Sequence, residues 1–289
     1  MLSDNILFNF AFRNIFRNRE RTFLTLSAIA FGTTAMILSG GFVEDTIFQL
    51  REGYIRGFTG HLQLYRKGFN SEGAARPFDY LVYNEKEVYK MLASLPYVRS
   101  YAGRLSFSGL LTAGESTISF MGLGVDPRKE GESSSLVQLD SGAKLKDLAP
   151  YDILAGRGLA KALRLKQGAQ LTLVANSKGG ALNAVDVAVG GVFSTIAADF
   201  DDRTVMLPLK TAQQFLLAEA VDTVTVLLDK TENTDAAMHG IMTAARERGF
   251  NLEIRPWYEL ADFAVKAVPF LRSLFWALNA ILIGMVALG

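Results

Sequence analysis

One uncharged stretch near the N-terminus constrains this chain more than any other feature. Residues Thr22 to Val43 contain no ionisable side chain. Within this stretch, Phe23 to Phe42 (FLTLSAIAFGTTAMILSGGF) supplies the roughly 20 residues that a helix needs to cross the hydrocarbon core of a bilayer. The sequence therefore predicts a transmembrane helix over residues 22–43.

Small side chains recur along this predicted helix and permit close packing against another membrane helix. They are Ser27, Ala28, Ala30, Gly32, Ala35, Ser39 and Gly40. A cleavable secretory signal is the alternative, since Ala28-Ile29-Ala30 resembles a small-x-small cleavage site. Cleavage there would leave only Phe23 to Ser27 as the apolar region, shorter than the roughly 7 to 15 residues that a signal requires. A retained helix is favoured.

Cationic residues just before the span predict its orientation, because cytoplasmic flanks are rich in Lys and Arg. They are Arg13, Arg17, Arg19 and Arg21. Only Asp4 and Glu20 oppose them, so we expect a cytoplasmic N-terminus. In the lead, residues 1–21, Phe8, Phe12 and Phe16 follow helical spacing, which is typical of an amphipathic helix lying on the inner leaflet. A simple extension of the first span into the cytoplasm is the alternative.

A second apolar segment closes the sequence. Residues 267–289, including Val268 to Gly289 (VPFLRSLFWALNAILIGMVALG), predict another transmembrane helix, with Arg272 and Trp276 as interfacial anchors near its outer end. Because the sequence stops inside this helix, we expect it to be a piece of a longer protein.

The segment between the spans, residues 44–266, has the composition of a folded globular domain. The chain has no cysteine, which excludes disulfides, thiol catalysis and thiolate metal sites. Its net charge is only +1, and acidic and basic residues nearly balance between the spans. We therefore expect no nucleic-acid partner.

Hydrophobic periodicity predicts an α+β extracytoplasmic domain. Glu44 to Phe58 continues the first span as a helical stalk that Gly57 and Gly60 end. Two βαβ-type units follow the pattern strand, helix, strand. The first comprises His61–Arg66, Glu85–Leu95 and Tyr97–Leu105, and the second comprises Thr223–Leu228, Asn233–Arg248 and Asn251–Pro256.

The two units bracket a small β-rich subdomain over about residues 135–215. Its expected elements are a short helix, a hairpin across Gly179-Gly180, a strand and a second helix. They are Arg157–Leu165, Gln170–Ala175 with Val185–Phe193, Thr204–Leu207 and Leu209–Ala218.

Motifs for chemistry are incomplete. The sequence has no Walker A, dinucleotide-binding or nucleophile-elbow pattern. Ser141 and Lys144 match S-x-x-K, but S-D-N is missing and Lys210-Thr211-Ala212 lacks the glycine of K-T-G. A helix cap is therefore the favoured role for Ser141.

Metal ligation is not predicted either. Asp199, Asp201 and Asp202 lack the glycine and distal glutamate of a calcium loop, so a solvated turn is favoured. His61 and His239 have no partner at metal-ligand spacing and are expected to be ordinary surface or partly buried residues. We predict no catalytic, cofactor-binding or metal site, and hence no enzyme.

Five segments resemble the FtsX-like, or MacB-like, permeases of ABC transporters, and together they extend along most of the chain. They are AFRNIFRNRERTFLTLSAIAFGTTAMIL (Ala11–Leu38), TGHLQLYRKGF (Thr59–Phe69), LAGRGLAKALRLKQGAQLTLVA (Leu154–Ala175), VGGVFSTIAADFDDRTVMLPLKTAQQFL (Val189–Leu216) and ALNAILIGMVALG (Ala277–Gly289). The chain looks closest to the lipoprotein-releasing permeases, with the macrolide-exporter permeases further away.

The resemblance implies a multi-pass protein of the bacterial inner membrane with a large periplasmic domain between the first and second of four spans. It implies a dimer with a second permease copy or paralogue, and a partner ATPase subunit that binds the ATP, so the chain itself needs no cofactor. Its cargo would be a lipoprotein or another amphiphile, and a periplasmic carrier would be a further partner. The stalk after Phe42 and the segment Trp257–Lys266 would act as two levers.

Two other function classes remain open. A membrane-anchored sensor with a ligand-binding ectodomain would be followed by a coiled coil and a kinase-like domain rather than by two more spans. An anchored periplasmic hydrolase would use Ser141, and acyl-enzyme labelling would test it.

Overall fold

The computed structural model describes residues 19–73, 75–129, 138–195 and 197–288. These residues form two compact units. One comprises the described parts of Met1–Arg51 and Asp262–Gly289, and the other is Glu52–Ala261. The predicted lead helix falls largely on residues 1–18 and so lies outside the described residues.

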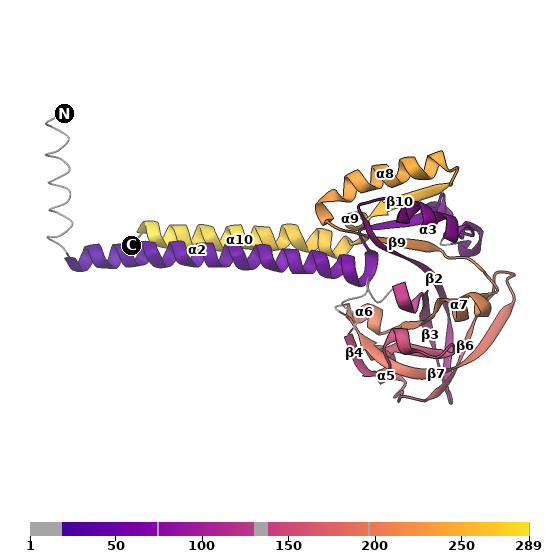
Figure 1. The fold of residues 1–289 in the computed structure, drawn as a ribbon. Helices are drawn as coiled ribbons and strands as arrows, with labels where there is room; N and C mark the ends of the chain where they lie inside the picture. The colour runs from indigo at the N-terminus through magenta and orange to yellow at the C-terminus, as the bar shows by residue number, and fades with distance from the viewer. Residues whose placement is uncertain (1–18, 74, 130–137, 196, 289) are drawn as a thin grey trace. The chain divides into compact units, whose positions relative to one another are not determined.

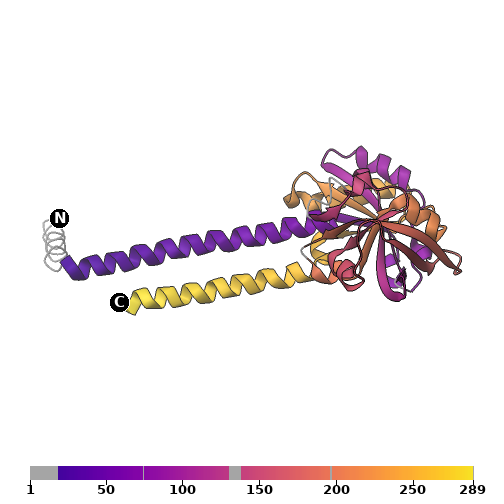
Figure 2. The ribbon, with the colours of Figure 1, turned by 90° about the horizontal axis from the view of Figure 1, so that it is seen from below.

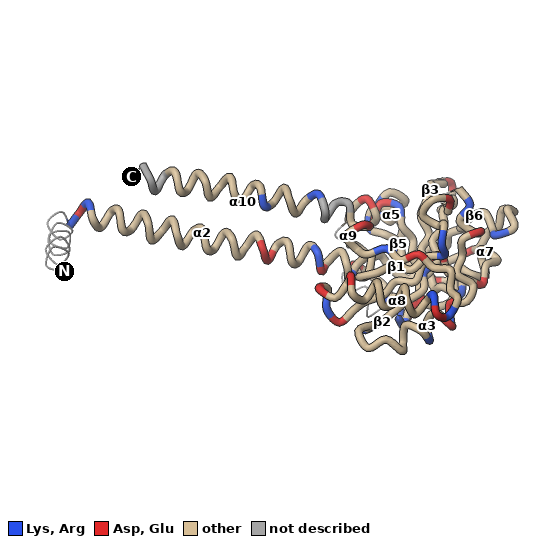
Figure 3. Tube along the Cα trace, turned by 90° about the horizontal axis from the view of Figure 1, so that it is seen from above, with Lys and Arg blue, Asp and Glu red and all other residues tan. Residues whose placement is uncertain are grey.

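The first unit contains two long helices, α2 (Arg19–Tyr54) and α10 (Asp262–Leu288), which run side by side in Figures 1 and 2. Only the last residues of α2 belong to the second unit. Large apolar side chains cover the helices and stay exposed, among them Phe31 at 79% and Trp276 at 70%. Charged residues are sparse along both helices and frequent in the other unit (Figure 3). Both helices are long and apolar enough to span a membrane.

The second unit is built around a ten-stranded sheet with the path β10-β1-β9-β2-β3-β8-β5-β7-β4, and β6 pairs with β2 and β7. Most neighbouring strands are antiparallel, whereas the β3–β8 and β5–β7 pairs are parallel. The strands are β1 (Leu62–Arg66), β2 (Val98–Ala113), β3 (Ser116–Val125), β4 (Gln138–Gly142), β5 (Asp152–Gly156), β6 (Gln170–Asn176), β7 (Leu182–Ser194), β8 (Thr204–Pro208), β9 (Thr223–Leu228) and β10 (Leu252–Pro256).

Helices and single turns connect these strands. The α-helices are α3 (Glu85–Ala93), α5 (Arg157–Ala162), α6 (Ala198–Asp201), α7 (Leu209–Leu216), α8 (Thr234–Glu247) and α9 (Trp257–Leu260). The π-helical turns are η1 (Ile55–Thr59) and η2 (Phe69–Gly73), and the 3-10 turns are η3 (Pro77–Tyr80), η4 (Leu145–Asp147) and η5 (Thr231–Asn233).

The α+β class is correct, but the two simple βαβ units are not confirmed. The predicted strand, helix, strand order occurs twice, as β1-α3-β2 and β9-α8-β10. However, β1 pairs with β10 and β9, and β9 pairs with β2, all antiparallel. Each unit is therefore split by a strand of the other, which is the interleaved arrangement known as split βαβ.

The strands between these two halves of the pattern include the predicted hairpin. Strands β6 and β7 pair antiparallel from Gln170↔Ala188 to Asn176↔Leu182, across a turn in which Gly180 has a φ of +79°. Strand β2 joins both parts of the sheet, because it pairs with β9 over Val98–Arg104 and with β3 over Arg104–Ala113. One buried cluster of apolar residues extends under both parts.

The expected stalk is present, since α2 runs without a break to Tyr54 and η1 follows it up to Gly60. The segment Trp257–Lys266 differs from a single rigid lever. It is divided between α9 and the start of α10 by Ala261, whose φ of −97° and ψ of 57° are not helical.

Candidate functional site

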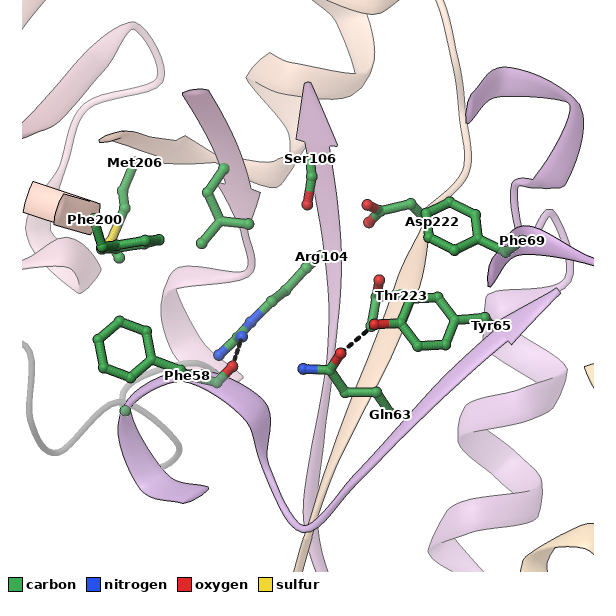
Figure 4. A pocket seen from close by; sticks show the side chains of 12 residues that line it. Phe58, Gln63, Tyr65, Phe69, Arg104, Ser106, Phe200, Met206, Asp222 and Thr223 are labelled. Carbon is green, nitrogen blue, oxygen red and sulfur yellow. Dashed lines mark hydrogen bonds between the residues drawn. The ribbon is translucent and has the colours of Figure 1, made fainter. Parts of the chain in front are cut away.

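A cavity of about 340 Å³ lies on one face of the sheet in the second unit (Figure 4). Strands β1, β2, β3, β8 and β9 supply most of its lining, and η1, η2 and α6 supply aromatic side chains. The lining residues are Gly57, Phe58, Gln63, Tyr65, Phe69, Arg104, Ser106, Leu123, Phe200, Met206, Asp222 and Thr223. The size falls at the lower end of the range for small-molecule pockets.

Alternation along the strands explains why polar side chains gather here. Gln63 with Tyr65 on β1, and Arg104 with Ser106 on β2, are two residues apart and so point to the same face. Arg104 pairs with Thr223 of β9, and the backbone N–H of Asp222 donates to the Arg104 carbonyl at 3.0 Å. This register places two charged residues of distant sequence position on the same cavity.

Asp222 and Arg104 are both buried, at 5% and 8% exposure. Burial raises the pKa of the Asp222 carboxyl from 3.8 to about 6, against the lowering effects of hydrogen bonds from Ser106 and of the Arg104 charge. Loss of hydration disfavours the charged form of a carboxyl, which gives this direction. The Arg104 Nη1 donates to the Phe58 carbonyl, so the guanidinium also holds η1 against β2.

Tyr65 closes the cavity beside the acidic group. Its hydroxyl donates to Gln63 Oε1, and burial, together with the negative charge of Asp222, raises the pKa of Tyr65 to about 12. The phenol is therefore a neutral hydrogen-bonding group at physiological pH.

Aromatic rings form the walls. Phe58 and Phe200 meet edge to face with centroids 5.2 Å apart, and Tyr65 stacks on Phe69 at 4.9 Å. Figure 4 shows these rings on either side of the Arg104, Ser106 and Asp222 side chains. The cavity thus combines apolar walls with a few buried polar groups, as is typical of sites for small ligands.

A second polar arrangement lies where the last turn of α2 meets the strands. The Leu228 N–H donates to His61 Nδ1 at 3.1 Å, which places the ring proton on Nε2, 3.0 Å from Thr231 Oγ1. The Thr231 hydroxyl in turn donates to Glu52 Oε1 at 2.7 Å. We call Glu52, Thr231 and His61 the stalk relay, because they connect the helix end to β1 and η5.

The role in membrane orientation that we predict for the arginines and Trp276 stays a prediction. Arg13 and Arg17 lie outside the described residues, while Arg19 and Arg21 are exposed at the start of α2. Arg272 lies 3.7 Å from Glu44 of α2, an exposed ion pair within the helical unit, and Trp276 is exposed on α10.

The predicted helix cap at Ser141 is wrong. Ser141 lies in β4 and is exposed, opposite Val192 of β7. Since β4 ends at Gly142 and Lys144 has extended backbone, Ser141 and Lys144 do not share a helical turn. The sequence around Ser141 does not indicate that this segment pairs with β7 as an edge strand.

The solvated turn predicted for three aspartates is partly wrong. Asp199 and Asp202 are exposed, but Asp201 is 5% exposed at the end of α6. Its carboxylate accepts hydrogen bonds from the Thr195 backbone N–H and hydroxyl, both at 2.8 Å. Among the residues searched, no three acidic or histidine side chains could hold a metal ion.

Sequence reasoning singled out none of the polar residues of the cavity, and it expected His61 to be less buried than its 3% exposure. A usable signal existed. Arg104 interrupts the apolar strand YAGRLSF, and Asp222 directly precedes the buried strand TVTVLL. Charged residues at such positions need compensating partners, so they mark a site more strongly than exposed serines or aspartates do.

The sequence and fold of this chain are similar to those of known periplasmic domains. Residues 22–244 match the family model of the MacB-like periplasmic core domain. The periplasmic region of MacB from Actinobacillus actinomycetemcomitans superposes with a TM-score of 0.51 at 14% identity, covering 72% of this chain and 94% of that one. The extracellular domain of the noncanonic ABC-type transporter YknZ from Gram-positive bacteria gives a TM-score of 0.49 at 12% identity, covering 67% of this chain and 98% of that one.

The class that these observations define is the permease component of an ABC-type transporter, with a MacB-like periplasmic domain of α+β fold. The chain belongs to the family of FtsX-like, MacB-like ABC transporter permeases. The match extends over the first apolar helix and most of the second unit, in agreement with the resemblance found in the sequence.

Proposed function

We propose that this chain is the permease subunit of an ABC transporter of the bacterial inner membrane, with Glu52–Ala261 in the periplasm. A cytoplasmic ATPase subunit binds and hydrolyses ATP, and the permease works as a dimer with a second copy or a paralogue. The cargo is a lipoprotein or another amphiphile, moved on the periplasmic side. The chain itself performs no chemistry.

The single observation that supports this mechanism best is the continuity of α2. Its 36 residues, Arg19–Tyr54, extend about 54 Å at 1.5 Å per residue, well beyond the roughly 30 Å hydrocarbon core. An unbroken helix that crosses a membrane and enters the domain can carry a tilt from one side to the other. The stalk relay then passes that tilt from Glu52 to the strands.

An insertion in the stalk tests the lever. Two glycines placed after Glu52 in the full-length protein should break the helix, because glycine disfavours helix by about 1 kcal/mol per residue. We expect cargo release in proteoliposomes to be lost, while copurification of the ATPase subunit and basal ATP hydrolysis persist.

The matched control carries the same two glycines between Gly179 and Gly180. Both glycines lie in the exposed β6–β7 turn, where a Cβ added to either glycine would meet no atom within 4 Å. This control should release cargo at the wild-type rate. Normal release by the stalk variant would contradict the lever mechanism.

A further inference from the structure

One carboxylate oxygen on the acidic side of the cavity has no hydrogen-bond partner in the described part of the chain. Asp222 is 5% exposed, and its Oδ1 has no hydrogen-bond partner in the described part of the chain. A buried carboxylate oxygen without a donor costs free energy, since its hydration is lost and not replaced. An open cavity beside such an oxygen is therefore suited to a ligand that brings the donor.

Two neighbouring donors already have acceptors. The Tyr65 hydroxyl donates to Gln63 Oε1, and the Arg104 Nη1 donates to the Phe58 carbonyl. Ser106 lowers the pKa of the Asp222 carboxyl by hydrogen bonding, yet Oδ1 has no hydrogen-bond partner in the described part of the chain. A ligand in the cavity can therefore supply a donor for Oδ1.

The charge of Asp222 and the aromatic walls of the cavity indicate which class of ligand would bind. With a pKa of about 6, the Asp222 carboxyl is mainly ionised above neutral pH. A cationic donor would therefore form a charge-assisted hydrogen bond with it, which is stronger than the bond from a neutral donor. Phe58, Phe69 and Phe200 line the same space. Aromatic faces attract cations as well as alkyl groups. An anionic ligand would place its charge beside the Asp222 carboxylate, while the Arg104 guanidinium in the same lining already donates to the Phe58 carbonyl.

We propose that this cavity binds a primary amine carrying a short apolar group, with the ammonium donating to Asp222 Oδ1 and the apolar group lying against Phe58, Phe69 and Phe200. A volume of about 340 Å³ suits a small amine. The inference goes beyond the proposed function, because it assigns a ligand to the domain itself. Because amine binding is measured without ATP, a negative binding result would contradict this inference without bearing on the proposed transport function.

The test uses the whole chain in phosphatidylcholine nanodiscs. Hexylamine, hexanol and hexanoate are titrated calorimetrically at about pH 7.5, where Asp222 is mainly ionised. We expect saturable binding of hexylamine and at least tenfold weaker binding of the other two compounds. Asp222→Asn should weaken hexylamine binding at least tenfold, and Asp229→Asn, which changes an exposed carboxyl, should leave it unchanged.

A second variant, Phe69→Leu, tests the same cavity in case Asp222→Asn does not fold. Phe69→Leu keeps every charge and removes one aromatic face, so it should weaken hexylamine binding several-fold. Partition into the lipid is common to all variants and cancels in the comparison. The proposal is overturned if hexanol or hexanoate binds as tightly as hexylamine, or if a folded Asp222→Asn variant binds hexylamine normally.

Discussion

At the scale of single residues, the most informative side chain is Asp222. An aspartate buried under strands is disfavoured unless it is paired. Here the Arg104 charge and Ser106 lower the pKa of the carboxyl, yet burial outweighs them and raises it from 3.8 to about 6. The folded chain therefore binds this proton more tightly than the unfolded chain does.

This difference predicts a pH dependence of stability. The contribution of Asp222 is most favourable below about pH 4 and is lost as the pH rises through about 6. At about pH 7.5 the ionised carboxyl costs on the order of 3 kcal/mol relative to low pH. Asp222→Asn should thus gain stability over the wild type with rising pH, measured as the midpoint of thermal unfolding in detergent.

Other carboxyls are present in both proteins and cancel in this difference, and Asp229→Asn, which changes an exposed carboxyl, serves as the control for the loss of one negative charge. A constant difference between wild type and Asp222→Asn from about pH 4 to about pH 7.5 would show that the carboxyl is not perturbed by burial.

Other residue-level predictions failed for one shared reason. Ser141 and Asp201 were interpreted from their immediate neighbours, but their roles depend on β7 and on Thr195. Arg104 and Asp222 are far apart in the sequence and meet only through the register of β2 and β9. Local patterns carry no information on such pairings.

At the scale of elements, the sequence predicted most helices and strands within a few residues. Strand β9 matches its predicted range, Thr223–Leu228, because every side chain in it is buried and the run is β-branched or aliphatic. Helix α3 begins at Glu85 as predicted and ends before Pro96. Strand β2 was underestimated, since Val98–Ala113 includes serines and glycines that do not favour strands.

The turn between η1 and β1 depends on a glycine. Gly60 has a φ of +66° and a ψ of −177°, a region that essentially only glycine adopts, and an added Cβ would lie 2.4 Å from the Thr225 side chain. Gly60→Ala should lower the free energy of unfolding by about 1 to 3 kcal/mol or more. Thermal unfolding in detergent measures the loss.

The comparison variant is Gly179→Ala. Gly179 has no positive φ, and a Cβ there meets no atom within 4 Å. It should unfold at the wild-type temperature. Equal midpoints for both variants would mean that the η1 turn tolerates a side chain.

The stalk relay makes a separate prediction. Thr231→Val keeps the shape of the side chain but removes the hydroxyl that contacts both His61 and Glu52, which should cost about 1 to 3 kcal/mol. Hydrogen exchange at the Leu228 amide should also become faster, because the His61 ring loses its support.

Thr243→Val is the matched substitution, since Thr243 is exposed and its hydroxyl donates to the His239 carbonyl within the same helix, α8. If the free energy of unfolding falls equally in both variants, the contacts of the Thr231 hydroxyl with His61 and Glu52 do not stabilise the fold.

At the scale of the whole molecule, the sequence predicted an α+β domain between two apolar helices but not the order of the strands. Each predicted strand, helix, strand unit is complete by itself in the sequence, so nothing local indicates that β9 lies between β1 and β2. That topology also creates the cavity, because it brings Tyr65, Arg104 and Asp222 to one face.

Strand β2 has a consequence for engineering. It supplies hydrogen-bonding edges to β9 at one end and to β3 and β6 at the other. If only the strands around β9, or only those around β3 and β6, were grafted into a related permease, β2 would lose one set of its partners. The unpaired strand edges would then be prone to aggregation. The smallest transplantable piece is therefore the entire segment Glu52–Ala261, and chimaeras should be joined at its two boundaries rather than within it.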